Sequence, residues 1–540
     1  MFEIPARLNL AAHVLDARVA EGRGARVAIR FDDAGPGAGR WGAVTYAELL
    51  DESNRVANVL AGLGVGRGDR VLVALPDGPP FAAAFFGALK VGAAVAMANP
   101  ELPAADYAAH LAYTRAKVLF VDAGLAARAA APIAEARELV AALVVGGGGE
   151  TARSLAYGAR VAAASTGFVN ADTAADDPAV WIATSGSTGS PRAAVHGHRS
   201  FAFSIEAYAK GVLGLGAGDV TLSVPKLYFG YATGMSLLFP LAVGATAVLY
   251  PDRPTPERMF ELVARHRPTV LALVPTLIAK MVAAAPRPEV ARAFAGARLA
   301  TSAGEALPVP LYARWRERFG VEIVEGLGSA ELFHIHLSNR AGDVRPGTLG
   351  RVVPGYEARV VRDDGSDAPD GEIGARWVRG GSAALRYEGD PERTAQVFGR
   401  ADGGWVATSD KVRRAGGVFT FEGRSDDMLK VGGIYVSPLE VENVLLQHPA
   451  VSECAVVAYE DEAGLVKPKA VVVVRGGDAA DPDTDTLWGE LDAFARARLA
   501  AFKVPRRWER LPALPRNDRG KLVRRTLRES GQTGDTGSSR

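Results

Sequence analysis

Short apolar runs alternate with alanine-rich segments along most of the chain. From about residue 40 onward, the alanine-rich segments carry apolar residues at helical spacing, and the strand-like runs between them include RVLVALP (70–76), KVLFVDA (117–123), GATAVLY (244–250) and PTVLALVP (268–275). Uninterrupted apolar strands that alternate with helices are typical of parallel sheets whose faces are covered by helices. The pattern therefore predicts an α/β fold.

The pattern changes near residue 421. A charged turn, a glycine pair and a short strand precede an amphipathic helix expected to begin at Pro438, and two apolar strands, a helix from Leu487 to Ala500 and a basic stretch follow. We therefore predict a large N-terminal domain of parallel-rich sheets (1–424) and a small α+β C-terminal domain (425–528). The remaining residues (529–540) lack apolar periodicity and predict a disordered tail.

Two segments could be mistaken for a membrane span and for a dinucleotide-binding loop. The apolar stretch FAAAFFGALKVGAAVAMANP (81–100) is interrupted by Lys90 and by glycines, so it predicts a buried helix followed by a buried strand and not a membrane span. Gly37, Gly39 and Gly42 have the spacing of a dinucleotide-binding loop, but no helix begins at Gly42. We interpret this segment as a hairpin loop.

Composition narrows the class of protein. The chain has 540 residues, too many for one ordinary domain, and its net charge of +1 argues against a nucleic-acid-binding surface. Cys454 is the single cysteine, which excludes an internal disulfide and a multi-cysteine metal site. The N-terminus lacks a secretion signal. These features predict a cytoplasmic protein, and they leave its oligomeric state open, with a homodimer as one alternative.

The segment TSGSTGSPRAAVHGH (184–198) is rich in small, hydroxyl-bearing residues and lies between two apolar runs, AVWIA (179–183) and AAV (193–195). Unobstructed backbone N–H groups, hydroxyls and one cation suit a polyphosphate, whereas a solvated linker is the alternative. The usual nucleoside-triphosphatase loop is excluded because Pro191 and Arg192 stand where it needs glycine and lysine. The predicted phosphate-binding residues are Thr184, Ser185, Gly186, Ser187, Thr188, Gly189 and Arg192.

Six motifs occur in a fixed order along nearly the whole chain: TSGSTGSPR, SAGEALP (302–308), EGLGSAE (325–331), TSD (408–410), GRSDDMLKVGGIYVSP (423–438) and PRNDRGK (515–521). Together they resemble the motifs of the acyl-adenylate-forming (AMP-binding) superfamily. Within it, the segments KLYFGYATGMSLLFPLAVGATAVLY (226–250) and ELFHIHLSN (331–339) resemble the benzoate and aminobenzoate CoA ligases.

The resemblance implies a two-step reaction. A carboxylic acid attacks the α-phosphate of ATP in the presence of Mg²⁺, pyrophosphate leaves, and CoA then converts the acyl adenylate into a thioester. The expected acid is benzoate or a small substituted benzoate such as anthranilate. One alternative is an enzyme that loads the aryl group onto the phosphopantetheine of a carrier protein. Another is a catalytically idle protein that binds a nucleotide or an acyl adenylate.

The resemblance also implies roles for single residues. Lys521, Glu331 and Arg192 would be catalytic, and Glu331 would hold Mg²⁺; the alternatives are a carboxylate at the start of a helix for Glu331 and a solvated charge run for Lys521. Asp410 would accept hydrogen bonds from the ribose hydroxyls, and Arg424 would meet the ribose and phosphate. Further residues expected around ATP and CoA are Gly304, Glu305, Glu325, Gly326, Leu327 and Gly433.

The acyl pocket is expected beside the α-phosphate. An aromatic wall opposite small residues would leave a flat slot, which favours a benzene ring over an alkyl chain. His334 would accept a hydrogen from a ring substituent, or else satisfy neighbouring backbone groups. The pocket residues implied by the resemblance are Tyr228, Ala303, Gly304, Leu327, Gly328, His334 and Ile335.

A lysine in the active site would obstruct the thiol, so the family resemblance implies that the C-terminal domain rotates between the two steps about Asp426. Gly433 would then line the pantetheine tunnel, and Phe502, Lys503 and Arg506 would contact the CoA nucleotide. The chain departs from the family at three places: Arg192 followed by Ala193 replaces lysine and glycine, Ala330 replaces a phosphate-binding threonine, and Ser409 replaces glycine.

Overall fold

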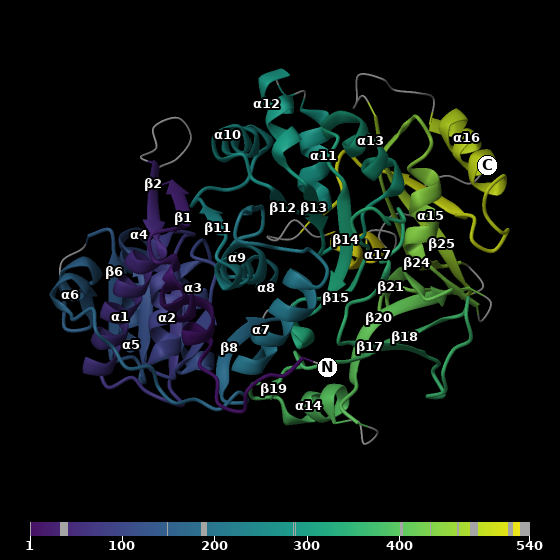
Figure 1. Cartoon of the computed structure of the whole chain (residues 1–540). Helices are drawn as coiled ribbons and strands as arrows, with labels where there is room; N and C mark the ends of the chain where they lie inside the picture. The colour runs from purple at the N-terminus through teal and green to yellow at the C-terminus, as the bar shows by residue number, and fades with distance from the viewer. Residues whose placement is uncertain are drawn as a thin grey trace.

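The structure is a computed structural model (Figure 1), and it describes residues 2–32, 41–147, 150–184, 192–284, 286, 288–399, 403–431, 434–461, 464–475, 484–516 and 522–529. Several predicted features lie outside the described residues. They are Ser185, Gly186, Ser187, Thr188, Gly189, Gly433 and Lys521, the glycines at 37 and 39, and the tail from 530 to 540.

One sheet of the N-terminal part is parallel through most of its width. Along it β3 pairs with β4 and β5, β4 with β8, and β5 with β6, all in parallel, whereas β9 and β19 close one edge in antiparallel fashion. In order the strands are β19 (Arg386–Tyr387), β9 (Ala193–Gly197), β8 (Pro178–Ala183), β4 (Ala94–Met97), β3 (Arg70–Ala74), β5 (Val118–Asp122), β6 (Ala141–Val145) and β7 (Ser154–Ala156).

Helices cover both faces of this sheet because alternate residues of its strands point to opposite sides. Val71 and Val73 share a core with α1 (Tyr46–Gly62) and α2 (Pro79–Lys90), whereas Leu72 and Ala74 share another with α3 (Ala104–Thr114), α4 (Ala123–Arg128) and α5 (Ala130–Glu135). The short α6 (Tyr157–Ala163) packs beside α1. The period of two therefore builds three layers.

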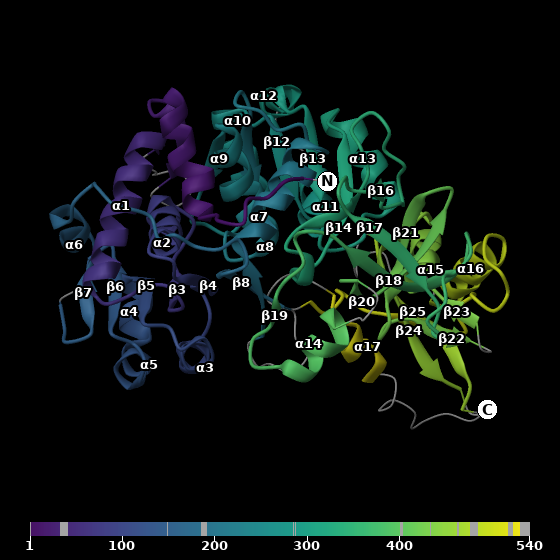
Figure 2. The same cartoon turned by 60° about the horizontal axis from the view of Figure 1, so that its bottom comes forward.

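The second large sheet lies beside the first (Figures 1 and 2). Its central strands β11, β10, β12, β13 and β14 run parallel, and β2 and β16 are at its edges. In order the strands are β16 (Arg351–Val352), β15 (Ile335–Ser338), β14 (Ile323–Gly328), β13 (Leu299–Ser302), β12 (Val270–Leu273), β10 (Val220–Ser223), β11 (Thr246–Leu249), β1 (Val27–Asp32) and β2 (Trp41–Thr45).

This sheet is also covered on both faces. Leu222, Leu271 and Ile323 face a core with α10 (Pro256–His266), α11 (Pro275–Ala283), α12 (Pro288–Ala293) and α13 (Val309–Phe319). Val270 and Leu299 face the core that α1 and α2 share with the first sheet. Helices α7 (His198–Ser204), α8 (Gly230–Thr233) and α9 (Phe239–Val243) complete that core.

The remaining strands form smaller sheets on the far side of the second sheet (Figure 1). One antiparallel sheet contains β17 (Glu357–Val361), β18 (Ile373–Arg379), β20 (Val406–Ala415) and β21 (Val418–Arg424). Helix α14 (Pro391–Phe398) lies between β18 and β20 in the sequence. Beyond it follow β22 (Leu429–Val431), β23 (Ile434–Val436), α15 (Pro438–Leu445), β24 (Val451–Glu460), β25 (Val466–Val474), α16 (Thr484–Arg496), β26 (Arg507–Arg510) and α17 (Arg524–Glu529).

The C-terminal elements have hydrophobic clusters of their own. One extends from Leu429 to Trp508 around the β24–β25 pair and includes Cys454, which is buried. A smaller cluster joins Leu514 and Leu527 to the other face of that pair. These separate clusters support the predicted boundary near residue 424, which remains a prediction.

The sequence predicted most of these elements. The four apolar runs are strands β3, β5, β11 and β12, and the fold class is confirmed. The stretch at 81–100 is helix α2 followed by β4, and within the described residues no helix is long and apolar enough to cross a membrane. Strands β1 and β2 pair as the two arms of a hairpin around the glycine-rich segment.

One predicted helix was misplaced. The helix expected from Leu487 to Ala500 runs from Thr484 to Arg496, and the backbone from 497 turns instead of continuing. Its polar first turn carries no apolar periodicity, which is why the pattern located the beginning too late.

Candidate active site

The predicted acyl-binding residues follow the carboxyl ends of strands in one sheet. Tyr228 comes after β10, Ala303 and Gly304 after β13, and Leu327 and Gly328 end β14. Because these strands are parallel, their carboxyl ends meet at the same edge. Small molecules bind preferentially at this edge of α/β sheets.

The predicted phosphate loop follows the carboxyl end of β8, in the sheet that contains β3 to β9. The backbone N–H of Thr184, just after β8, donates to the carbonyl of Arg192, at 2.9 Å, just before β9. This hydrogen bond closes the neck of the loop, whose tip (185–191) lies outside the described residues. Next to it, the Ala193 N–H donates to Tyr113 Oη at 2.9 Å. The two ends of the loop are thus fixed.

Glu331 lies where the two large sheets meet. Its carboxylate Oε1 accepts a hydrogen bond from Tyr387 Oη at 2.5 Å, and Tyr387 stands on β19 beside Ala194 of β9. Burial, and after it the charge of Glu331, raises the pKa of the Tyr387 phenol, which therefore stays a donor. The backbone of Glu331 is held too, because its carbonyl accepts the Ala384 N–H at 2.8 Å.

A short 3-10 helix (Ala330–Leu332) carries Glu331, and His196 braces it. His196 Nε2 lies 2.6 Å from the Ala330 carbonyl, so Nε2 is the protonated nitrogen. Burial lowers the pKa of His196 to about 4, which keeps the ring neutral. The methyl group of Ala330 offers no donor, as the sequence already indicated.

Phe333, directly after this helix, adopts φ 62°, a conformation rare for a side chain of its size. Its ring packs 4.4 Å from that of Phe201 and stays buried, so packing compensates the backbone strain. The sharp turn it makes leads the chain from Glu331 into His334 and β15.

Glu325 ties two motifs together instead of facing outward. Its carboxylate Oε1 accepts the Leu307 N–H at 2.8 Å, which links β14 to the SAGEALP loop. Burial raises the pKa of Glu325 to about 8. In the same loop Gly304 has φ +95°, a conformation that favours glycine, and a Cβ there would meet open space.

The environment of His334 is aromatic and tight. Nε2 lies 3.2 Å from the Tyr231 carbonyl, and the ring centroid is 4.6 Å from that of Phe239. A Cβ at Gly234 would lie 2.5 Å from His334 Cδ2, so Gly234 leaves the room that the ring occupies. Burial lowers the pKa of His334 to about 3, and the ring is neutral. The predicted backbone contact of this histidine is therefore present.

Small residues are required around Ile335. A Cβ on Gly326 would lie 2.7 Å from Ile335 Cγ2, and one on Gly328 would lie 2.8 Å from the His334 carbonyl oxygen. The glycines of EGLGSAE thus permit β15 to lie against β14. Tyr228 is partly buried, and its ring centroid is 4.5 Å from that of Phe229.

Several buried polar atoms at this edge lack protein partners. Within the described part of the chain, Ser302 Oγ, Ser329 Oγ and His334 Nδ1 accept or donate no hydrogen bond. Buried polar groups are normally satisfied, so unpaired ones at a site indicate a place for a ligand or water.

The predicted ribose residues lie side by side on neighbouring strands. Asp410 and Arg424 are register partners on β20 and β21. Arg424 Nη2 donates to Ser409 Oγ at 3.0 Å, and the carboxylate of Asp410 is held by Arg376 at 2.5 Å. Asp410 and Arg424 therefore lie side by side, at the end of β21 from which the chain continues into the C-terminal elements.

The described C-terminal residues make other contacts. Arg528 Nη2 donates to the Asp426 carbonyl at 2.7 Å, so helix α17 is attached to the predicted hinge. Lys503 Nζ donates to both carboxylate oxygens of Glu440, at 2.6 and 2.7 Å, and Arg506 donates to the Ala501 carbonyl at 3.2 Å. Phe502 is partly buried. In this structure Lys503 is thus engaged within the C-terminal part.

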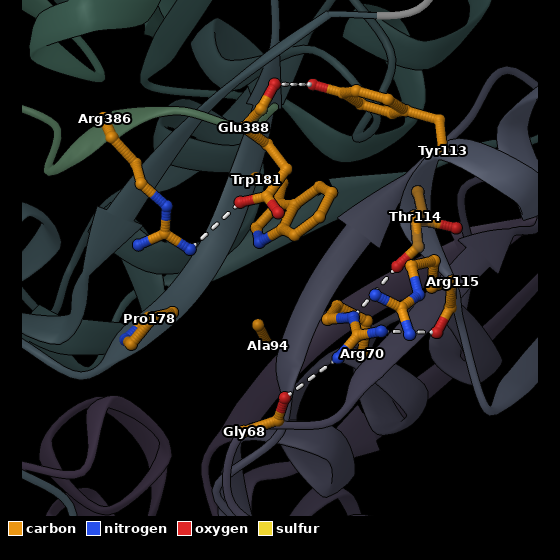
Figure 3. Close-up of a pocket in the computed structure, with 10 residues that line it drawn as sticks. All are labelled: Gly68, Arg70, Ala94, Tyr113, Thr114, Arg115, Pro178, Trp181, Arg386 and Glu388. Carbon is orange, nitrogen blue, oxygen red and sulfur yellow. Dashed lines mark hydrogen bonds and ion pairs between the residues drawn. The ribbon is translucent and has the colours of Figure 1, made fainter. Parts of the chain in front are cut away.

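A cavity of about 150 Å³ lies away from these residues, at the amino ends of β3, β4 and β8 (Figure 3). Arg70 there donates to the backbone carbonyls of Gly68, Thr114 and Arg115. No described residue of the predicted site lines this cavity. It is at the edge of the sheet opposite to the one where the motifs converge.

Sequence reasoning missed Tyr387 and Arg376. Tyr387 lies in LRYEGDPERT, where Asp390 caps helix α14, and the cap signal pointed to the helix and not to the tyrosine before it. Arg376 lies two residues from Gly374 and from Val378, on the same buried face of β18. The period of two could therefore have placed this charge on a core face.

Comparison with known proteins decides the family. Residues 16–388 match the AMP-binding enzyme family, and residues 440–521 match the AMP-binding enzyme C-terminal domain. The chain belongs to the AMP-binding enzymes. It is 42% identical over 531 residues to a benzoate–CoA ligase of Thauera aromatica, with 98% of this chain and 97% of the relative covered.

Solved structures of AMP-binding enzymes agree with this result. A benzoate CoA ligase from Burkholderia xenovorans LB400 superposes with a TM-score of 0.85 at 38% identity, covering 96% of this chain and 100% of that one. The anthranilate CoA ligase AuaEII in complex with anthranoyl-AMP gives a TM-score of 0.88 at 34% identity, with 98% of each chain covered. The resemblance inferred from the motifs is therefore confirmed.

Proposed function

We propose that this AMP-binding enzyme is an ATP-dependent aryl-CoA ligase that activates benzoate or a small substituted benzoate such as anthranilate. The observation that carries the proposal is the likeness to a benzoate–CoA ligase over nearly the whole of both chains. In the first step a carboxylate oxygen bonds to the α-phosphorus of ATP and pyrophosphate leaves. In the second, the CoA sulfur bonds to the acyl carbon, AMP leaves and the thiol proton passes to solvent.

The first step concentrates negative charge around phosphorus, so it depends on fixed donors and cations. Thr184 and the loop after it would hold the outer phosphates, and Arg192 would add a charge at the loop neck. His196 is neutral and supports the backbone, so the proposed cations are Arg192, Lys521 and, beside the ribose, Arg424. Asp410 and Arg424 would receive the ribose.

Glu331 fits the proposed Mg²⁺. Among the described residues, no group of three or more histidine, cysteine, aspartate or glutamate side chains could hold a metal ion. Mg²⁺ needs no such cage, because it commonly binds through one or two carboxylates together with substrate phosphates and water. The hydrogen bond from Tyr387 holds the Glu331 carboxylate in place, and this carboxylate would hold the ion, which would neutralise charge on the phosphates.

The acyl group would lie at the carboxyl edge of β10, β13 and β14. Aromatic residues around His334, small residues at Ala303, Gly304 and Gly328, and Ile335 support a flat pocket. Since Nε2 of His334 donates to Tyr231, the neutral ring presents Nδ1 as an acceptor. An amine or hydroxyl on the aromatic ring would suit it.

The test is pyrophosphate release with ATP and Mg²⁺ across benzoate, anthranilate, hydroxybenzoates, cinnamate and octanoate, each with and without CoA. Turnover confined to small aryl acids and accelerated by CoA is the expected result. Preference for octanoate would overturn the pocket, and the absence of acid-dependent release would overturn the enzyme. A parallel assay with a phosphopantetheine-bearing carrier protein examines the alternative acceptor: faster transfer to it than to CoA would replace CoA ligation.

A further inference from the structure

Strand β20 bulges opposite one residue of β18. The register between the two strands shifts between Ala375 and Trp377, so that residues 408–410 of β20 stand opposite Arg376. Bulges of this kind change the direction of side chains and are frequent beside functional sites. Here the bulge consists of the motif Thr408, Ser409 and Asp410.

Arg376 contacts both ends of this bulge. Its backbone carbonyl accepts the Thr408 hydroxyl at 3.0 Å, and its guanidinium Nη2 donates to Asp410 Oδ2 at 2.5 Å. Thr408 Oγ1 in turn lies 3.4 Å from the Asp410 N–H. Arg376 therefore holds the side chains at both ends of the bulge, the Thr408 hydroxyl through its carbonyl and the Asp410 carboxylate through its guanidinium.

The position of Arg376 is costly. The side chain is fully buried, and it lies on the same face of β18 as Gly374 and Val378. A buried guanidinium is stable only when its charge and its donors are satisfied. In the part of the chain that the structure describes, its Nε and Nη1 have no hydrogen-bond partner, and its ion pair is with Asp410.

Among the described residues, His336 is a second titratable group beside Arg376, and it is neutral. His336 lies on β15 and is buried, and burial together with the neighbouring Arg376 holds the pKa of His336 well below its usual range. The carboxylate of Asp410 is thus the group that neutralises Arg376. A side chain needed only for packing would not have to carry a charge at this position.

We infer that Arg376 is a positioning residue that orients the Asp410 carboxylate and thereby determines selectivity for the ribose hydroxyls of the nucleotide. The inference rests on the proposed nucleotide role of Asp410. With Oδ2 anchored to Arg376, the carboxylate is held in one orientation, and its remaining acceptor positions would be available to the ribose hydroxyls. Without the anchor the carboxylate is free to turn away.

The experiment compares kcat/KM for ATP, 2′-deoxy-ATP and 3′-deoxy-ATP in the wild type and in R376M, R376K and D410A, with benzoate saturating. R376M keeps the volume without the charge, and R376K keeps the charge without the fork. We expect R376M to lose about 10- to 100-fold in kcat/KM for ATP, the range of a hydrogen bond to a charged group. Its discrimination between ATP and the deoxy nucleotides should fall toward that of D410A, with R376K between them.

R413M is the matched control, because Arg413 pairs with Glu422 on the same sheet, at 2.7 Å, and does not contact Asp410. It should keep the wild-type discrimination. A merely structural role for Arg376 would lower kcat/KM for all three nucleotides equally, and that result, in R376M or in the milder R376K, overturns the inference alone. If D410A discriminates as well as the wild type, the ribose role of Asp410 in the proposed function is overturned as well.

Discussion

Burial decides the charge of the titratable residues at this site. Burial lowers the pKa of His196 and His198 to about 4 and that of His334 to about 3, so these rings are neutral near pH 7. Burial acts in the opposite sense on Glu325, whose pKa it raises to about 8, so this acid is protonated at neutral pH. His196 beside Glu331, His334 in the proposed acyl pocket and Glu325 on β14 are thus uncharged near pH 7.

Glu325 gives a pH-dependent prediction. Its folded pKa of about 8 exceeds the ordinary 4.5, so the folded state binds the proton more tightly and stability falls as pH rises between these values. E325Q keeps an acceptor for the Leu307 N–H and cannot ionise. Relative to E325Q, the wild type should lose about 1.4 kcal/mol per pH unit across this interval.

Urea unfolding at pH 5, 6 and 7.5 measures this difference. The free energy of unfolding of E325Q minus that of the wild type should rise steadily from pH 5 to pH 7.5. E322Q, which alters a carboxylate near the surface, serves as control. Parallel stability curves for E325Q and the wild type would contradict the assignment of a protonated Glu325.

His334 predicts a specificity effect. If its bare Nδ1 accepts a hydrogen from an ortho amine, H334A should reduce kcat/KM for anthranilate relative to benzoate by about two- to tenfold, the value of one neutral hydrogen bond. Benzoate is the internal control, since it lacks the donor. An unchanged ratio between the two acids would remove His334 from the recognition of ring substituents.

At the scale of elements, short segments hold the side chains of the proposed site in place, whereas the long strands determine only which segments lie near one another. The two residues of β19, the 3-10 helix at 330–332 and the bulge of β20 each hold one side chain of the proposed site. Strand β19 pairs with β9 directly after the phosphate loop, and its tyrosine reaches across to the second sheet. A small displacement of β19 would therefore move Glu331.

Tyr387 provides a prediction about metal dependence. Y387F removes the donor to Glu331 Oε1 while keeping the ring, so the carboxylate loses its fixed orientation. The Mg²⁺ concentration for half-maximal pyrophosphate release should rise about three- to tenfold, equivalent to one hydrogen bond. Y250F is a control, because Tyr250 Oη donates to the Ser223 carbonyl at 3.1 Å inside the second sheet. Equal Mg²⁺ requirements in both variants would contradict the role of Tyr387.

The strands and the motif positions could be predicted because apolar runs and glycine-rich turns are local signals. Parallel pairing then places the residues after β10, β13 and β14 at one edge without further information. The partners of Glu331 and Asp410 could not be predicted in this way. Tyr387 and Arg376 are 56 and 34 residues from the carboxylates they hold, and such contacts depend on register and on a bulge that no local pattern records.

At the scale of the whole molecule, polar contacts between described residues link the C-terminal part to the rest. Tyr435 Oη donates to the Asp363 carboxylate at 3.0 Å, and Ser425 Oγ donates to the Ser409 carbonyl at 2.9 Å. Arg516 lies 3.9 Å from the Glu305 carboxylate of the SAGEALP loop. Polar and charged contacts at a partly exposed boundary contribute little each, so they are compatible with the proposed rotating domain.

The proposed rotation predicts that the two chemical steps separate. K521A should lower acid-dependent pyrophosphate release by at least about 100-fold, because it removes a cation from a charged transition state. The same variant, given synthetic benzoyl-AMP and CoA, should form benzoyl-CoA at a rate close to that of the wild type. K503A is the comparison from the same C-terminal part. If K521A lost the same factor in the rates of both assays, the result would contradict a C-terminal domain that presents different residues to the active site in the two steps.

The buried Cys454 has a practical consequence for following that motion. It is the single thiol of the chain, 7% exposed and enclosed by the hydrophobic cluster around β24 and β25, and burial holds its pKa well above the usual range. Thiol-directed dyes react with exposed thiolates, so they should pass over it. Two cysteines placed on exposed helices of the two parts would then take a donor and an acceptor fluorophore in the otherwise natural sequence, and energy transfer between them would report the angle of the C-terminal domain during turnover.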